Sequence, residues 1–121
     1  MSYNDKIKEV IETSDVALFM KGTPSFVMCG NSDRALQALR RAGAPVTAVD
    51  VLPNPQIRQA LSAISGWPTI PQVFVKGELV GGADIVEEME RSGELEETLT
   101  AKLGANYAET RGESVVTLIE R

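Results

Sequence analysis

The most informative absence in this chain is histidine. None of the 121 residues is a histidine, which removes the commonest general base and the commonest metal ligand of proteins. Catalysis by a Ser-His-Asp triad or a Cys-His pair is therefore excluded. A zinc site would need several Cys or His ligands, and this chain cannot supply them alone.

Cysteine is nearly absent as well, because Cys29 is the only one in the sequence. An internal disulfide is therefore impossible, and we expect a reducing compartment, most simply the cytoplasm. Any soft metal bound at Cys29 must take further sulfur ligands from outside the chain.

Long apolar runs and an excess of basic residues are also missing. No run approaches the length of a membrane span, and the first residues begin no secretory apolar segment. A net charge of −5 argues against non-specific nucleic-acid binding, which needs a basic surface. The length and the 43% hydrophobic content suit one domain with its own core. We expect a cytoplasmic protein whose partners are neither nucleic acid nor membrane.

The features that are present gather around Cys29. The apolar run Val16–Met20 predicts a buried strand, which Gly22, Thr23 and Pro24 break into a loop. Apolar residues between positions 35 and 42 recur at helical spacing, so Cys29 lies at the start of a helix. Unpaired amides and the helix dipole, together with the nearby Lys21, should lower the pKa of the thiol.

A lone cysteine is more often a small buried hydrophobic residue. Here the residues that follow, Gly30 to Asp33, are small or polar and suit an exposed helix start. This context favours a reactive thiol. A redox-inert binding module remains the alternative, and a lack of thiol reactivity at neutral pH would support it.

Periodicity along the rest of the chain predicts the order α-β-α-β-α-β-β-α-α. The expected helices cover about residues 3–12, 30–42, 55–65, 85–89 and 95–103, and the expected strands cover 16–20, 46–51, 72–75 and 79–80. The β-α-β start favours a parallel strand pair. We therefore expect an α/β fold with a mixed sheet covered by helices on both faces.

Three residues have ordinary interpretations when pattern alone is used. Arg58 falls off the apolar stripe of its helix and is expected to be solvated. Pro71 directly precedes a strand and is expected to follow a trans peptide bond. Asp84 is expected to cap the helix that follows it, with any ligand role added to this one.

Four motifs in this order and spacing resemble the monothiol glutaredoxins of the CGFS class. They are F-M-K-G-T-P ending at Pro24, C-G-N-S beginning at Cys29, W-P-T-I-P-Q at residues 67–72, and G-E-L-V-G-G-A-D-I at residues 77–85. The likeness covers about residues 6–103. It implies a thioredoxin fold, with a central mixed four-stranded sheet and helices on both faces, and a cis peptide bond before Pro71.

The resemblance also implies a division of the chain and a glutathione site. Residues 1–104 would form the glutaredoxin domain, and residues 105–121 an extension of unknown role in which 114–119 predicts a strand or a sticky tail. Cys29 would be the catalytic residue, Lys21 and Arg58 would bind the glycine carboxylate of glutathione, Ile70 would pair by its main chain with the cysteinyl part, and Ala83 and Asp84 would take the γ-glutamyl end. A tripeptide with two carboxylates and one ammonium group needs cations at one end and an acceptor with helix-start amides at the other.

A 2Fe-2S cluster is implied by the same resemblance. The cluster takes four thiolates, which Cys29 from each of two subunits and two glutathiones would supply in a homodimer. The protein would then be a carrier that hands the cluster to apo iron-sulfur proteins. The alternative is a glutathione-dependent thiol-disulfide oxidoreductase without a stable cluster, in which the Cys29 thiolate attacks a glutathione mixed disulfide. The sequence does not separate the two.

The chain departs from the class at three places. Asn31 stands where members usually carry Phe, and we expect its amide to bond the sulfur or to admit water, either of which changes cluster potential and lifetime. Phe26-Val27-Met28 lacks the usual proline before the cysteine. Ala83 stands where cysteine is frequent, so a disulfide from Cys29 to that position is excluded.

Overall fold

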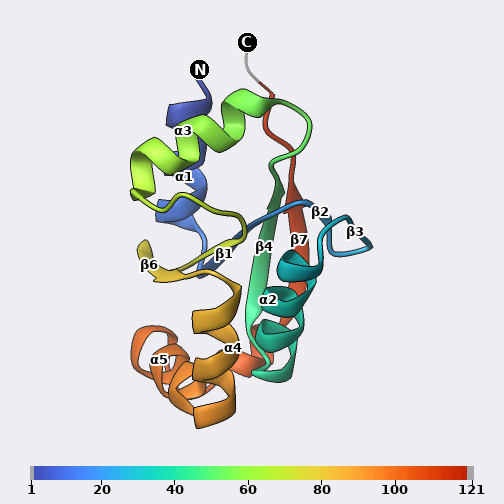
Figure 1. Cartoon of the computed structure of the whole chain (residues 1–121). Coiled ribbons are helices and arrows are strands. Elements are labelled where there is room, and N and C mark those ends of the chain that lie inside the picture. Colours follow the sequence, from blue (N-terminus) through green and yellow to red (C-terminus); the bar gives the residue numbers. More distant parts are fainter. Residues whose placement is uncertain (1, 120–121) are drawn as a thin grey trace.

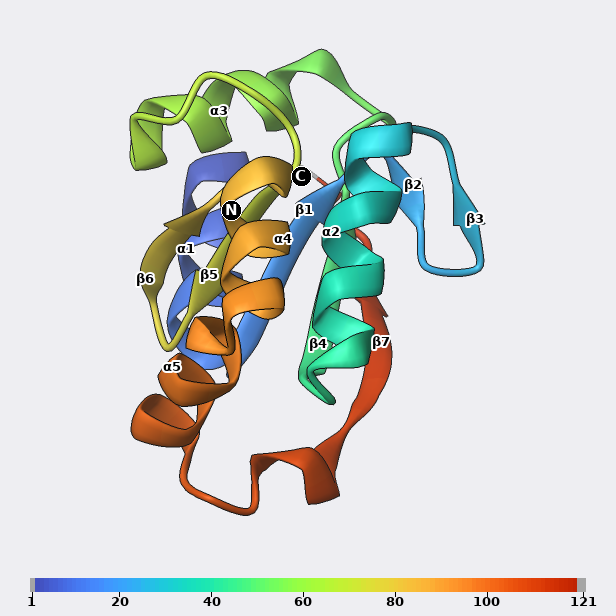
Figure 2. The same cartoon turned by 60° about the horizontal axis from the view of Figure 1, so that its bottom comes forward.

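Two layers of helices enclose a central sheet in the computed structural model, which describes residues 2–119 (Figure 1). Helices α1 (Tyr3–Thr13) and α3 (Pro55–Ser65) pack on each other against one face of the sheet. On the other face α2 (Gly30–Arg41) lies beside α4 (Ala83–Ser92), and α5 (Glu94–Leu103) packs on α4 (Figure 2).

The central sheet is mixed and has the strand order β6-β5-β1-β4-β7. The strands are β1 (Val16–Met20), β4 (Pro45–Asp50), β5 (Gln72–Val75), β6 (Glu78–Gly81) and β7 (Gly112–Val116). Strand β4 runs parallel to both of its neighbours, whereas β5 is antiparallel to β1 and to β6. A separate two-stranded hairpin, β2 (Gly22–Thr23) and β3 (Phe26–Val27), lies between β1 and α2.

Strand β1 is buried on both faces, which explains its unbroken apolar sequence. Val16, Leu18 and Met20 point into the core under α2 and α4. Ala17 and Phe19 point into the core under α1 and α3. The strand therefore joins the two cores, and both helix layers depend on it.

The ends of α3 follow from its sequence as expected. The side chain of Asn54 accepts a hydrogen bond from the amide of Gln56, and Pro55 occupies the first helical position. Gly66 ends the helix in the left-handed conformation with φ of 72°. All five predicted helices are present, and the α/β thioredoxin fold class with helices on both faces of a mixed sheet is confirmed.

The sheet has five strands, however, and not the expected four. The additional strand is β7, which overlaps residues 114–119, the region predicted to be a strand or a sticky tail, and pairs in parallel with the free edge of β4. Two contacts hold this C-terminal segment. Arg40 of α2 forms a two-point ion pair with Glu113. The hydroxyl of Tyr107, in the short helix η1 (Tyr107–Thr110), donates to the carbonyl of Ala42 at 2.7 Å. Residues 105–119 are thus packed on the domain.

No helix between residues 2 and 119 combines the length and the apolar character that crossing a membrane requires.

The packing of the C-terminal segment generates a stability prediction. Leu118 is 6% exposed and belongs to the core under α1 and α3, whereas Val115 of β7 is 51% exposed. Leu118→Ala should lower the free energy of unfolding by about 2–3 kcal/mol, because it removes buried methyl groups and leaves a cavity. The matched control Val115→Ala should lower it by less than about 0.5 kcal/mol. Urea unfolding followed by circular dichroism measures both, and equal losses would contradict the packing described here.

Candidate active site

Cys29 is the residue immediately before α2, in extended conformation with φ of −154° and ψ of 132°. The loop that delivers it is fixed at Lys21. The carbonyl of Lys21 accepts from the amide of Met28, and the amide of Lys21 donates to the hydroxyl of Ser32, both at 3.0 Å. Cys29 is half-buried, so part of the residue is exposed to solvent.

The environment lowers the pKa of the Cys29 thiol. The largest cause is the backbone amide of Ser32, which donates toward the sulfur, and the amide of Asn31, the hydroxyl of Ser32 and the charge of Lys21 act in the same direction. Burial opposes them by disfavouring the thiolate. The expected direction is confirmed, but the helix-start amides contribute more than the lysine.

A groove of about 370 Å³ opens beside the start of α2. Three segments line it: Asn31 from α2, the loop before β5, and the start of α4. The lining residues are Asn31, Trp67, Thr69, Ile70, Pro71, Gly82, Ala83, Asp84 and Ile85. The peptide bond between Ile70 and Pro71 is cis, as the resemblance implies and against the expectation from pattern alone.

The residues expected to bind a tripeptide divide between the groove and its surroundings. Ile70, Ala83 and Asp84 line the groove. Lys21 and Arg58 do not. Lys21 is half-buried at the end of β1, and Arg58 is exposed on α3, where its guanidinium donates to the carbonyl of Pro68 at 3.4 Å. Arg58 thus reaches the loop that carries Thr69 and Ile70, although its exposure also fits the solvated interpretation.

The start of α4 differs from the expectation, because Asp84 is not the N-cap. The N-cap is Gly82, and Asp84 is the second residue of the helix. A side chain at Gly82 would place its Cβ 3.3 Å from both the Pro71 carbonyl oxygen and the Trp67 indole nitrogen, a contact tighter than most, so the close approach of the two segments favours glycine. Since glycine offers no capping side chain, the first amides of α4 have no side-chain cap, and the residues that carry them line the groove.

A cluster of polar side chains around Arg34 was missed by the sequence reasoning. The guanidinium of Arg34 bonds Asp84 at 2.8 Å, Glu87 at 2.9 Å and the side-chain oxygen of Asn31 at 3.2 Å. Arg34 thereby lowers the pKa of Glu87, and its own pKa is raised by the two carboxylates. Asn31 precedes Arg34 by three positions and Asp84 precedes Glu87 by three, so each pair shares a helix face, but nothing local predicts that α2 and α4 meet there.

The loop before β5 is held by the buried side chain of Gln72. Its amide nitrogen donates to the carbonyls of Trp67 and Thr69 at 2.9 and 3.2 Å. The indole nitrogen of Trp67 and the side-chain oxygen of Gln72 are buried without a hydrogen-bond partner among residues 2–119. The Trp67 nitrogen belongs to a residue of the groove wall.

Metal-ligating side chains do not cluster in the part of the chain that the structure describes. Among residues 2–119, no group of three or more His, Cys, Asp or Glu side chains could hold a metal ion. Cys29 could serve as one ligand of a metal ion. Because it is the only cysteine of the chain, any further sulfur ligands would come from outside this copy.

Comparison with known proteins places these features in one family. Residues 16–80 match the glutaredoxin family model. The chain is 48% identical over 103 residues to glutaredoxin 4 of Pasteurella multocida, an alignment that covers 85% of this chain and 94% of that protein. It is 51% identical over 88 residues to the probable monothiol glutaredoxin GrlA of Legionella pneumophila, covering 73% of this chain and 99% of that one.

Solved structures agree with the sequence comparisons. Reduced poplar apo GrxS14 superposes with a TM-score of 0.75 at 39% identity, over 84% of this chain and 94% of that one. A truncated monomeric mutant of Trypanosoma brucei 1-C-Grx1 gives a TM-score of 0.76 at 41% identity, over 84% and 93%. With one cysteine at the start of α2 and no second cysteine to pair with it, the chain belongs to the glutaredoxin family and, within it, to the monothiol glutaredoxins.

Proposed function

We propose that this monothiol glutaredoxin binds glutathione beside Cys29 and, as a homodimer, carries a 2Fe-2S cluster that it hands to apo iron-sulfur proteins. The observation that carries the proposal is a thiol with a lowered pKa two residues before Asn31, which lines a groove together with the N-terminus of α4. Amides that face a groove bind carboxylates, and a thiolate binds iron or attacks sulfur.

The chemistry of glutathione matches the groove at its γ-glutamyl and cysteinyl parts, and two cations outside the groove suit its glycine end. The γ-glutamyl residue carries an α-carboxylate and an ammonium group, which the first amides of α4 and the carboxylate of Asp84 would bind. The main chain of Ile70 would pair with the cysteinyl residue and so hold its thiol toward Cys29. Lys21 and Arg58 would bind the glycine carboxylate, and neither forms an ion pair within residues 2–119 that would compete.

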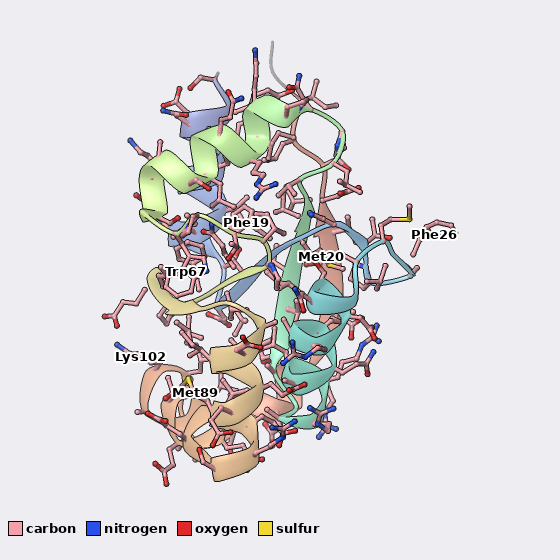
Figure 3. All side chains as sticks on the ribbon, viewed as in Figure 1. Phe19, Met20, Phe26, Trp67, Met89 and Lys102 are labelled. Carbon is pink, nitrogen blue, oxygen red and sulfur yellow. The ribbon has the colours of Figure 1, made fainter. Side chains whose placement is uncertain are left out.

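A cluster shared between two copies is consistent with the surface around Cys29. Phe26 is 72% exposed and Met28 is 58% exposed on the segment that leads to the cysteine, and Figure 3 shows Phe26 projecting from the hairpin away from the rest of the chain. Exposed apolar side chains beside the cysteine offer a surface on which a second copy would pack. Two such surfaces meeting would bring together two thiols, and two bound glutathiones would complete the four thiolates that the cluster needs.

The second candidate function, disulfide reduction, is favoured by the lowered pKa of Cys29. In this reaction the Cys29 thiolate attacks the glutathione sulfur of a mixed disulfide, a Cys29–glutathione disulfide forms, and the other protein leaves as a thiolate. A second glutathione thiolate then attacks the sulfur of the bound glutathione. Glutathione disulfide leaves, and the Cys29 thiolate is regenerated.

Reconstitution tests the ligand count of the cluster. The chain incubated anaerobically with iron, sulfide and glutathione should give a coloured dimer that contains one glutathione per subunit, because each copy supplies a single thiolate. Omitting glutathione, or substituting Cys29→Ser, should leave the protein colourless and monomeric. A coloured monomer without glutathione, identified by size-exclusion chromatography and thiol analysis, would overturn the cluster proposal.

Substitution of Arg58, one of the two cations outside the groove, tests where the glycine carboxylate binds. Arg58→Ala should raise the dissociation constant of glutathione about tenfold or more, since a charge-assisted contact to a carboxylate is worth about 1.5–3 kcal/mol. Arg111→Ala is a matched control, because Arg111 is also exposed and also donates to a main-chain carbonyl, that of Ala108. Calorimetry on both variants gives the comparison. An unchanged affinity of the Arg58 variant would mean that Arg58 is only a solvated surface residue.

The pH dependence of Cys29 alkylation tests the oxidoreductase proposal. Alkylation of Cys29 by iodoacetamide should reach half of its maximal rate at a pH below the ordinary thiol pKa of about 8.5. Ser32→Ala should move this midpoint upward and slow alkylation at pH 7, because the hydroxyl that stabilises the thiolate is removed. If both proteins titrate at the ordinary value, Cys29 is not activated, and the reductase reaction loses its support.

A further inference from the structure

Asn31 occupies the wall of the groove that faces the start of α4. It is the residue that α2 contributes to the lining, and Ala83, Asp84 and Ile85 line the groove from α4. Its side chain is exposed, so a molecule in the groove can reach it.

Arg34 determines which end of the Asn31 amide faces the groove. A guanidinium has only donors, so the group that Asn31 turns toward Arg34 must be its oxygen, and the two atoms are 3.2 Å apart. The amide nitrogen of Asn31 therefore points away from Arg34. This nitrogen has no hydrogen-bond partner in the part of the chain that the structure describes, and its two N–H groups are free to donate.

The opposite wall makes an anion the appropriate partner for these donors. The first amides of α4 have no side-chain cap, and Gly82 to Ile85 line the same groove. The two carboxylates nearby, Asp84 and Glu87, are both paired with Arg34 at 2.8 and 2.9 Å, which reduces their repulsion of an incoming negative group. The side-chain N–H groups of Asn31 on one side and the helix-start amides on the other form a binding site for one carboxylate.

We propose that Asn31 determines specificity for the γ-glutamyl end of glutathione by donating a hydrogen bond from its side-chain nitrogen to the α-carboxylate of that residue. Arg34 acts as the positioning residue that holds the Asn31 oxygen and pairs with Asp84. The assignment rests on the proposed binding of glutathione and deepens it. Phenylalanine, the usual residue of the class at this position, cannot make this bond, so the contact belongs to the C-G-N-S sequence of this chain.

A pair of ligands and one substitution test the assignment. Asn31→Asp keeps the oxygen that Arg34 bonds and replaces the free donor by a second oxygen, which repels a carboxylate. The two ligands are glutathione and 4-aminobutanoyl-cysteinyl-glycine, which retains the ammonium group and lacks only the α-carboxylate of the γ-glutamyl residue. Dissociation constants are measured by NMR titration of the reduced protein, with the side-chain amide signals of Asn31 followed in the unchanged chain.

Asn31→Asp should raise the dissociation constant of glutathione about tenfold and that of the analogue less than twofold. The Asn31 side-chain signals should shift on binding glutathione and shift little with the analogue. Asn31→Ala, which removes the donor without adding charge, should weaken glutathione binding by a smaller factor.

Three outcomes would overturn the assignment. If the unchanged chain binds glutathione and the Asp variant binds it equally, Asn31 makes no contact. If the variant loses affinity for both tripeptides by the same factor, the effect does not arise at the α-carboxylate. If the unchanged chain does not bind glutathione at all, the proposed function itself is wrong, and this assignment falls with it.

Discussion

The structure depends on the complete burial of β1 at the centre of the sheet. The residues of β1 are at most 1% exposed, and their side chains belong alternately to the two cores. Because β1 and β4 run parallel while β5 runs the opposite way, the chain leaves β1 at the same end at which it enters β5, and Phe19 is the register partner of Gln72. The loop before Cys29 and the loop before β5 therefore meet at one edge, where the groove lies.

Asp50, the last residue of β4, holds two loops by hydrogen bonds at that edge. One of its carboxylate oxygens accepts from the amides of Gly22 and Leu52, both at 2.9 Å. Gly22 itself has φ of 96°, and a Cβ there would lie 2.4 Å from the Phe26 carbonyl oxygen, so no other residue fits this turn. The position of Cys29 is thus fixed from β4 and from the hairpin as well as from α2.

Local pattern predicted most of the elements, because each helix and buried strand carries its own periodicity. It also placed Cys29 at a helix start, where amides lower the pKa of the thiol. It was incomplete or wrong where contacts between distant residues decide. The pattern of residues 114–119 left a strand or a sticky tail open, and strand β7 forms because β4 has a free edge, with Ser114 paired to Thr47, 67 positions away. Likewise, Asp84 looked like a cap by composition, but the chain begins α4 two residues earlier, and Asp84 pairs instead with Arg34 on another helix.

Charge explains why a glutathione site in this chain would depend on short-range donors. The chain carries a net charge of −5, and glutathione, with two carboxylates and one ammonium group, is also negative, so the overall field opposes binding. That field is screened beyond about 8–10 Å at physiological salt. Contacts closer than this decide the outcome, and in the proposed site they would come from the amides of α4, the amide of Asn31 and the cations Lys21 and Arg58. Neutral donors such as amides have a particular advantage, because they stabilise a carboxylate without drawing the acidic side chains of Asp84 and Glu87 away from Arg34.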